Sequence, residues 1–200
     1  MLKKFILVIL IFTMVGCTPA PPHHQSNVCR IFRQYPQWYW ATQDAQKHWG
    51  VPISVQMAII HQESHFNGDA RPARERILWV IPWKRPSSAR GYSQALNGTW
   101  HRYQRETHHN SARNNFEAAT DFLGWYSYRA HRKLGIPLNN AYALYLAYHE
   151  GIGGYARGTY RKQSWLIHVA ERVQTQANIY HYQLTRCERS LPKKPWYRFW

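Results

Sequence analysis

The stretch Trp49-Gly-Val-Pro-Ile-Ser-Val-Gln-Met-Ala-Ile-Ile-His-Gln-Glu-Ser-His-Phe-Asn67 decides the fold of this chain. Gly50 stops the helix that precedes it, and Pro52 suits the first turn of a new helix. The apolar residues that follow recur at helical spacing. We therefore predict a helix from about Pro52 to Ser64, packed in the core of the protein.

Glu63 interrupts the apolar face of this helix. At about 100° per residue it projects between Ile59 and Ile60, with Val55 and Ile53 to either side. A carboxyl group in that setting is partly desolvated, which raises its pKa. A carboxyl that is protonated at neutral pH is what a general acid needs to cleave a glycosidic bond. The competing interpretation is a solvated or capping glutamate, which is the commoner role at a helix end.

Helical patterns account for most of the remaining chain. Capping residues and apolar spacing predict helices over 38–48, from 97 or 99 to 107, from 114 or 115 to 134, from 139 or 140 to 151, and over 164–184. Ile77 to Trp83 is the exception, since it reads as a short hairpin or as a loop filled by its tryptophans. The expected fold class is all-α with one irregular insertion.

The composition indicates one domain with a large excess of positive charge. The chain has 200 residues, with 26 Lys and Arg against 10 Asp and Glu and a formal net charge of +16. Its length allows a single well-buried core. No nucleic-acid motif is visible, so for an exported protein this charge points to phospholipid headgroups, lipopolysaccharide or the carboxylate-rich cell wall. The scarcity of acidic residues also keeps the list of possible acid catalysts short.

The N-terminus predicts export. Lys3 and Lys4 precede the apolar run Phe5 to Val15, which has the length of a signal-peptide core and is short for a membrane span. The run ends in Met14-Val-Gly-Cys17, which resembles a bacterial lipobox. We expect a signal peptide over 1–16, a lipid on Cys17, a flexible Pro-rich tether over 17–28, and a periplasmic protein anchored to the outer membrane. A secretory signal cleaved elsewhere and an uncleaved anchor are the alternatives.

Two cysteines remain once Cys17 carries a lipid. Cys29 and Cys187 lie at opposite ends of the mature chain, and in an oxidising compartment they are expected to pair. Two reduced, buried thiols are the alternative. Two cysteines alone cannot form a zinc site.

A zinc hydrolase is the rival among enzymes, because His61 and His65 stand at a spacing that can chelate zinc on a helix. Glu63 lies about 200° around the helix from His61, however, and would face away from that metal. Neither order of the zincin motif is present. We expect no metal and no cofactor.

Four motifs, in order, resemble the soluble lytic transglycosylase family, which is related to goose-type lysozymes. The helix that ends in Glu63-Ser64 is similar to the first motif of that family, and Gly91-Tyr-Ser-Gln94 is similar to its Gly-Leu-Met-Gln. Ala147-Tyr-His-Glu-Gly-Ile-Gly153 matches the third motif in frame. Tyr180, with Tyr182 as its rival, is similar to the tyrosine on the last helix. The resemblance covers roughly residues 38–186.

The resemblance implies a lysozyme-like helical domain, here over 29–190, with a groove for glycan strands. Its substrate would be peptidoglycan, cleaved between N-acetylmuramic acid and N-acetylglucosamine. A single glutamate would protonate the leaving oxygen, and the 6-hydroxyl of the muramoyl sugar would then attack its own anomeric carbon to give a 1,6-anhydro end. Because that attack is intramolecular, it needs neither a nucleophilic carboxylate nor a base for water.

The resemblance also implies roles for individual residues. Glu63 would be the acid and base, and Ser64 would orient it or contact the sugar, unless its hydroxyl bonds to the helix backbone. Gln94 would hydrogen-bond the muramoyl sugar or Glu63, and Gly91 would let the backbone approach the groove. The remaining expected contacts to substrate or to Glu63 are Tyr92, Ser93, Tyr148, His149, Glu150 and Tyr180.

Three departures from the family pattern keep alternatives open. Tyr92-Ser93 stands in place of Leu-Met, and His149 stands in place of an asparagine whose hydrogen bonds an imidazole can replace. Glu150 replaces an alanine: it is a solvated charge, a partner of His149, or a second carboxylate that activates water as in a hydrolytic lysozyme. Besides a transglycosylase and a hydrolase, a protein with this fold could be a non-catalytic glycan-binding or assembly lipoprotein.

Two segments are unassigned by the motifs. The stretch 69–90, rich in arginine and tryptophan, is longer than the family usually carries and is suited to bind glycan, membrane or a partner. The tail 191–200 is basic and aromatic, which suits a membrane interface or a partner groove, including a partner in the cell envelope or a secretion machine.

Overall fold

The computed structural model describes residues 18–74, 76–77, 81–82 and 86–196. The predicted signal peptide over 1–16 and the lipidation residue Cys17 lie outside these ranges, as do Trp79 and Trp83 of the insertion. No helix within the described ranges is both long enough and apolar enough to cross a membrane.

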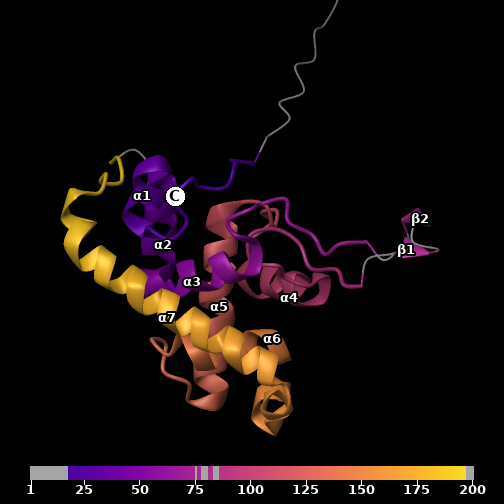
Figure 1. The fold of residues 1–200 in the computed structure, drawn as a ribbon. Coiled ribbons are helices and arrows are strands. Elements are labelled where there is room, and N and C mark those ends of the chain that lie inside the picture. Colours follow the sequence, from indigo (N-terminus) through magenta and orange to yellow (C-terminus); the bar gives the residue numbers. More distant parts are fainter. Residues whose placement is uncertain (1–17, 75, 78–80, 83–85, 197–200) are drawn as a thin grey trace, which may run out of the picture.

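Helices form nearly all of the described secondary structure (Figure 1). The α-helices are α1 (Val28–Gln34), α2 (Pro36–Trp49), α3 (Ile53–Ser64), α4 (Asn97–Thr107), α5 (Phe116–Leu134), α6 (Ala141–Arg157) and α7 (Ser164–Cys187), with 3-10 turns η1 (Thr159–Lys162) and η2 (Glu188–Ser190). The strands β1 (Arg76–Ile77) and β2 (Ile81–Pro82) pair antiparallel as a hairpin that projects from the helices. The predicted fold class, all-α with an irregular loop or short hairpin as an insertion, is confirmed, and the described part of the insertion is a hairpin.

The stretch that was expected to decide the fold forms the central helix. Every residue of α3 from Ile53 to Ile60 is buried, and the helix contacts α2, α5, α6 and α7. It begins after Pro52 and ends at His65, which adopts a left-handed conformation with φ 49°. The last turn of α3, which carries Glu63, is partly buried and directly follows the buried part of the helix.

Helix boundaries follow the capping residues with two differences. The side chains of Asn115 and Asn140 accept hydrogen bonds from the first turns of α5 and α6, as expected. The predicted end of a helix at Gly151 is wrong, because the chain kinks there with φ 74° and ψ 155° and α6 continues to Arg157. Helix α1 was not predicted, since seven residues give too little periodicity to recognise.

The described part of the expected tether lies against the domain. The hydroxyl of Tyr35 donates to the carbonyl of Ala20 at 2.7 Å, and Tyr180 donates to the carbonyl of Gln25. The amide of Gln183 donates to the carbonyl of Ser26 at 3.0 Å. Carbonyls within residues 18–27 of the expected tether are therefore bonded to Tyr35, between α1 and α2, and to side chains of α7.

A disulfide joins the two ends of the described chain. Cys29 on α1 is bonded to Cys187, the last residue of α7, and Cα atoms 158 residues apart in sequence lie 6.1 Å from one another. Both cysteines are buried. The bridge fixes α1 against the end of the longest helix.

Candidate active site

Glu63 lines a cavity of about 450 Å³. The wall contains residues of the loop before α4, of α5 and of the kinked part of α6, and Glu63 enters it from the last turn of α3. The lining residues are Glu63, Ala89, Gln94, Ala95, Leu96, Thr99, Phe122, Tyr126, Tyr148, His149, Glu150 and Gly151. Three segments far apart in sequence are thus brought to one carboxyl group.

Two opposing effects set the ionisation of Glu63. Together they raise its pKa to about 7. Burial is the larger effect and raises the pKa, because a charged carboxylate is poorly solvated among apolar groups. A hydrogen bond from the hydroxyl of Tyr145 lowers the pKa in part, since it stabilises the carboxylate. The group can consequently exist in both protonation states near neutral pH, which suits a residue that gives and then takes a proton.

A tyrosine of α6 is hydrogen-bonded to the loop before α4, and this bond joins two parts of the cavity wall. Tyr148 lines the wall, and its hydroxyl donates to the carbonyl of Ser93. Burial raises the pKa of Tyr148 well above its usual value, and the charge of Glu63 adds to this effect. Tyr145, whose pKa is also raised by burial, and Tyr148 therefore remain hydrogen-bond donors at any physiological pH.

Gln94 lines the cavity from a strained turn. Its φ is 48°, a left-handed value that is uncommon for a residue with a side chain. The side-chain nitrogen donates to the carbonyls of Ala70 and Gly91 at 2.9 and 2.8 Å, so this nitrogen holds the loop in shape. The side-chain oxygen is the part of Gln94 left to contact a ligand or Glu63.

Glu150 places a second carboxylate on the wall of the same cavity. It accepts a hydrogen bond from the hydroxyl of Thr159, and the Nδ1 atom of His149 lies 3.3 Å from its Oε1. The bond from Thr159 is the main reason that the pKa of Glu150 is lowered from its usual value. Two carboxyl groups with opposite pKa shifts therefore share one cavity.

The kink at Gly151 lets α6 contribute to the wall. With φ 74° and ψ 155°, this residue occupies a backbone region that is essentially restricted to glycine. The kink separates the segment that carries Tyr145 and Tyr148 from the final turns of the helix. Gly151 itself lines the cavity next to Glu150.

Comparison with known sequences identifies the fold family. Residues 5–187 match the sequence profile of the transglycosylase SLT domain family. The chain belongs to this family. The family consists generally of peptidoglycan lytic transglycosylases. No curated protein and no solved structure matches the chain.

The SLT domain does not use Tyr180 as expected. Tyr180 is fully buried on α7, its hydroxyl donates to the carbonyl of Gln25, and it is not among the residues that line the cavity with Glu63. Its rival Tyr182 lies on the surface, 55% exposed, with Arg186 over its ring. The tyrosine that bonds to Glu63 is Tyr145, which the motifs did not single out. In the sequence, Tyr145 stands about one helical turn before Tyr148 and so shares its helix face, and this spacing is the signal that could have identified it.

The Gly91–Gln94 motif of the SLT domain is mostly structural. Tyr92 and Ser93 are fully buried, and neither is among the residues that line the cavity with Glu63. Gly91 has φ 80°, and a Cβ atom there would lie 2.1 Å from the carbonyl oxygen of Arg113. The close approach that requires this glycine is thus made by the backbone at Arg113 and not by a ligand.

The side chains of Ser64 and His65, at the end of α3, contact backbone carbonyls of the helix. The hydroxyl of Ser64 donates to the carbonyl of Ile60 at 3.2 Å, and Ser64 is outside the cavity lining. Nδ1 of His65 lies 2.7 Å from the carbonyl of His61, and their rings are 5.2 Å apart. Within the described ranges, no group of three or more His, Cys, Asp or Glu side chains is arranged to hold a metal ion.

Proposed function

We propose that this SLT domain cleaves peptidoglycan between N-acetylmuramic acid and N-acetylglucosamine, with Glu63 as the single general acid and base. The observation that carries the proposal is a carboxyl group that lines a cavity and whose pKa is raised to about 7. Near pH 7 a large share of such a group is protonated, and its pKa is matched to both proton transfers.

The proposed reaction needs two proton transfers at one carboxyl group. Glu63 gives its proton to the glycosidic oxygen while the bond from that oxygen to the anomeric carbon breaks. The 6-hydroxyl oxygen of the same muramoyl sugar then bonds to the anomeric carbon, and its proton returns to the Glu63 carboxylate. The products are a 1,6-anhydromuramoyl end and a free N-acetylglucosamine end, and water is not consumed.

Hydrolysis is the second candidate because Glu150 lines the same cavity. Its lowered pKa keeps it ionised, as a base that activates water must be. The bonds from Thr159 and the contact with His149 give it an alternative, purely structural role. The products distinguish the two reactions.

The test is mass spectrometry of purified sacculi digested by residues 18–200, beside the Glu63→Gln and Glu150→Gln variants. We expect 1,6-anhydro products from the wild type and from Glu150→Gln, and a loss of at least about 100-fold in Glu63→Gln, which keeps the shape but not the proton. The fragment begins at residue 18 because residues 20–26 bond to Tyr35, Tyr180 and Gln183.

Other product patterns would contradict the assignment. Reducing ends that disappear in Glu150→Gln would show a hydrolase with two carboxylates. No products from a folded wild-type domain would favour a glycan-binding or assembly protein.

We also propose that the mature protein is anchored in the periplasm by a lipid on Cys17, as the Met14-Val-Gly-Cys17 sequence favours. Thr18 after that cysteine favours the outer membrane over the inner one. Intact mass and membrane fractionation of the full chain test this, because a Cys17→Ser variant would lose both the lipid and membrane retention.

A further inference from the structure

Both ends of the described chain meet on one face of the molecule. We call the residues 18–27, α1, η2 and residues 191–196 the terminal face. Residues 18–27 accept hydrogen bonds from Tyr35, between α1 and α2, and from Tyr180 on α7. The guanidinium of Arg33 lies 3.4 Å from the hydroxyl of Ser190 in η2. The disulfide between Cys29 and Cys187 fixes α1 to the end of α7 beneath this face.

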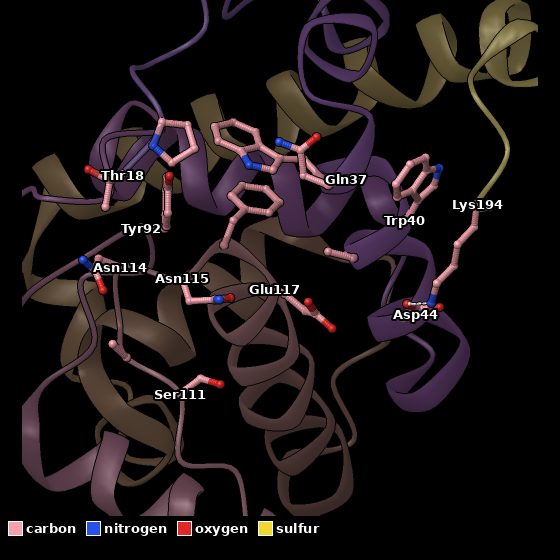
Figure 2. A pocket seen from close by; sticks show the side chains of 15 residues that line it. Thr18, Gln37, Trp40, Asp44, Tyr92, Ser111, Asn114, Asn115, Glu117 and Lys194 are labelled. Atoms are coloured by element: carbon pink, nitrogen blue, oxygen red, sulfur yellow. Dashed lines mark hydrogen bonds and ion pairs between the residues drawn. The ribbon is translucent and has the colours of Figure 1, made fainter. Parts of the chain in front are cut away.

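A cavity of about 720 Å³ shows how close the two ends lie. Thr18 and Pro19 line it together with Lys194, and Figure 2 shows Thr18 and Lys194 on opposite rims. The ammonium group of Lys194 is paired with the Asp44 carboxylate at 2.6 Å. The indole of Trp40 donates to the carbonyl of Pro192 at 2.8 Å, so the C-terminal segment is held along α2 as far as the rim.

The terminal face has the composition expected of a surface that binds anionic lipid headgroups. Residues 18–34 and 188–196 contain five Lys or Arg and one acidic residue, Glu188, which accepts a hydrogen bond from Tyr39. Arg30, Arg33, Arg189 and Lys193 are exposed. Trp196 is 78% exposed at the edge of this basic surface. Basic side chains beside an exposed indole match the headgroup region of a bilayer, where tryptophan is enriched.

The position of the N-terminal segment adds a geometric reason. The hydroxyl of Thr18 bonds to Asp69, so the chain is already held on the domain at the first described residue. A lipid on Cys17 would be one peptide unit away, which leaves no free linker. Any membrane that holds that lipid would then lie next to Thr18, which is one end of the terminal face.

We infer that the terminal face docks on the surface of an anionic phospholipid bilayer, independently of any lipid on the chain. Docking there fixes the orientation of the domain. α1 and α6 lie near opposite ends of α7 (Figure 1), and α7 has 24 residues, which corresponds to about 36 Å. The α6 end of α7 is thereby directed away from the membrane (Figure 1).

The experiment uses residues 18–200 without a lipid, because this fragment keeps both paired cysteines and all buried residues of the described core. Sedimentation with vesicles of phosphatidylglycerol and phosphatidylethanolamine is compared with sedimentation with phosphatidylcholine vesicles. We expect binding to the anionic vesicles, weakened as salt is raised.

The charge variant is Arg30→Glu with Lys193→Glu, and its control is Arg105→Glu with Lys162→Glu. All four side chains are exposed and both pairs change the net charge equally. Arg30 is in the first turn of α1, where a glutamate is favoured, so the variant is expected to fold. Binding should fall about 20-fold or more in the first pair and much less in the control.

The aromatic variant is Trp196→Ala, and its control is Trp165→Ala, since Trp165 is also exposed (54%) but lies at the other end of α7. We expect a loss of about fivefold or more only in Trp196→Ala. Equal losses in each variant and its control, or no binding of the fragment, would overturn the inference. A dimer that Arg30→Glu with Lys193→Glu dissociates would also overturn it, because the face would then be an interface between copies.

Discussion

At the scale of single residues, one tyrosine tunes the proposed acid. The hydroxyl of Tyr145 bonds to Glu63 and counteracts the rise in pKa that burial produces. The effect is mutual, since burial and the Glu63 charge raise the pKa of Tyr145 far above its usual value. The acid and its partner belong to two helices, α3 and α6, that pack against one another.

Replacing Tyr145 with phenylalanine should move the pH dependence upward. Without the hydrogen bond the Glu63 carboxylate is less stable, so its pKa rises above about 7 and the protonated form persists to higher pH. We expect the alkaline limb of kcat/KM to shift to higher pH, with a loss of rate well below the roughly 100-fold expected for loss of the acid. The measurement is a pH profile of sacculus cleavage.

Tyr182→Phe is the control for that experiment, because this tyrosine lies on the surface of α7. Its profile should match the wild type. An alkaline limb that stays in place, or moves to lower pH, in Tyr145→Phe would mean that Tyr145 does not stabilise the Glu63 carboxylate.

The sequence predicted the acid but not its partner. Glu63 could be found because a carboxylate on an apolar helix face is recognisable from spacing alone. The choice between Tyr145 and Tyr180 depends on which helix face turns toward α3, and this is a property of tertiary packing. The same reason explains Tyr92 and Ser93, whose burial follows from how the loop folds back rather than from their polarity.

At the scale of elements, the kink in α6 is the feature that shapes the site. A helix continued straight through Gly151 would change the direction of the turns that follow Tyr148 and Glu150. Apart from the adjoining residues and the nearby backbone of α6 itself, no atom lies within 4 Å of where a Cβ of Gly151 would stand, so space does not require glycine there. The backbone conformation of this residue, with φ 74° and ψ 155°, is what requires glycine.

Gly151→Ala should therefore destabilise the protein by about 1–3 kcal/mol through backbone strain, and it should lower activity because the wall of the cavity moves. Gly153→Ala is the matched control: Gly153 is exposed, its φ is not positive, and its Cβ would meet only the end of the flexible Arg157 side chain. Urea unfolding and sacculus cleavage measure both effects. Equal unfolding free energies for the two variants would contradict the strain.

Helix boundaries were predictable where a single residue decides them. Pro52, Asn115, Asn140 and Gly135 each occupy the helix terminus that their chemistry favours. Gly151 misled the prediction because glycine ends helices and kinks them by the same conformational freedom. Only the packing around α6 distinguishes the two outcomes.

At the scale of the whole molecule, the disulfide closes nearly the entire domain into one loop. A cross-link over 158 residues restricts the unfolded chain more than a short one does. We expect the Cys29→Ser, Cys187→Ser double variant to lose about 2–5 kcal/mol of unfolding free energy, measured by urea denaturation.

Reduced wild type is the internal control, because it should match the double variant under the same conditions. Equal stability of the oxidised wild type and the double variant would show that the bridge does not contribute to folding. The pairing was expected from compartment and cysteine count alone, whereas the packing of residues 18–27 beside it was hidden by their proline-rich, tether-like sequence.

The bridge between Cys29 and Cys187 also has a mechanical consequence. An enzyme that holds a taut cell-wall polymer while its N-terminus is fixed experiences tension along its own backbone. Eleven residues after Thr18, that load reaches Cys29 and divides between α1 and, through the covalent link, the far end of α7. The N-terminal helix therefore cannot be peeled from the domain without also pulling on the last turn of α7.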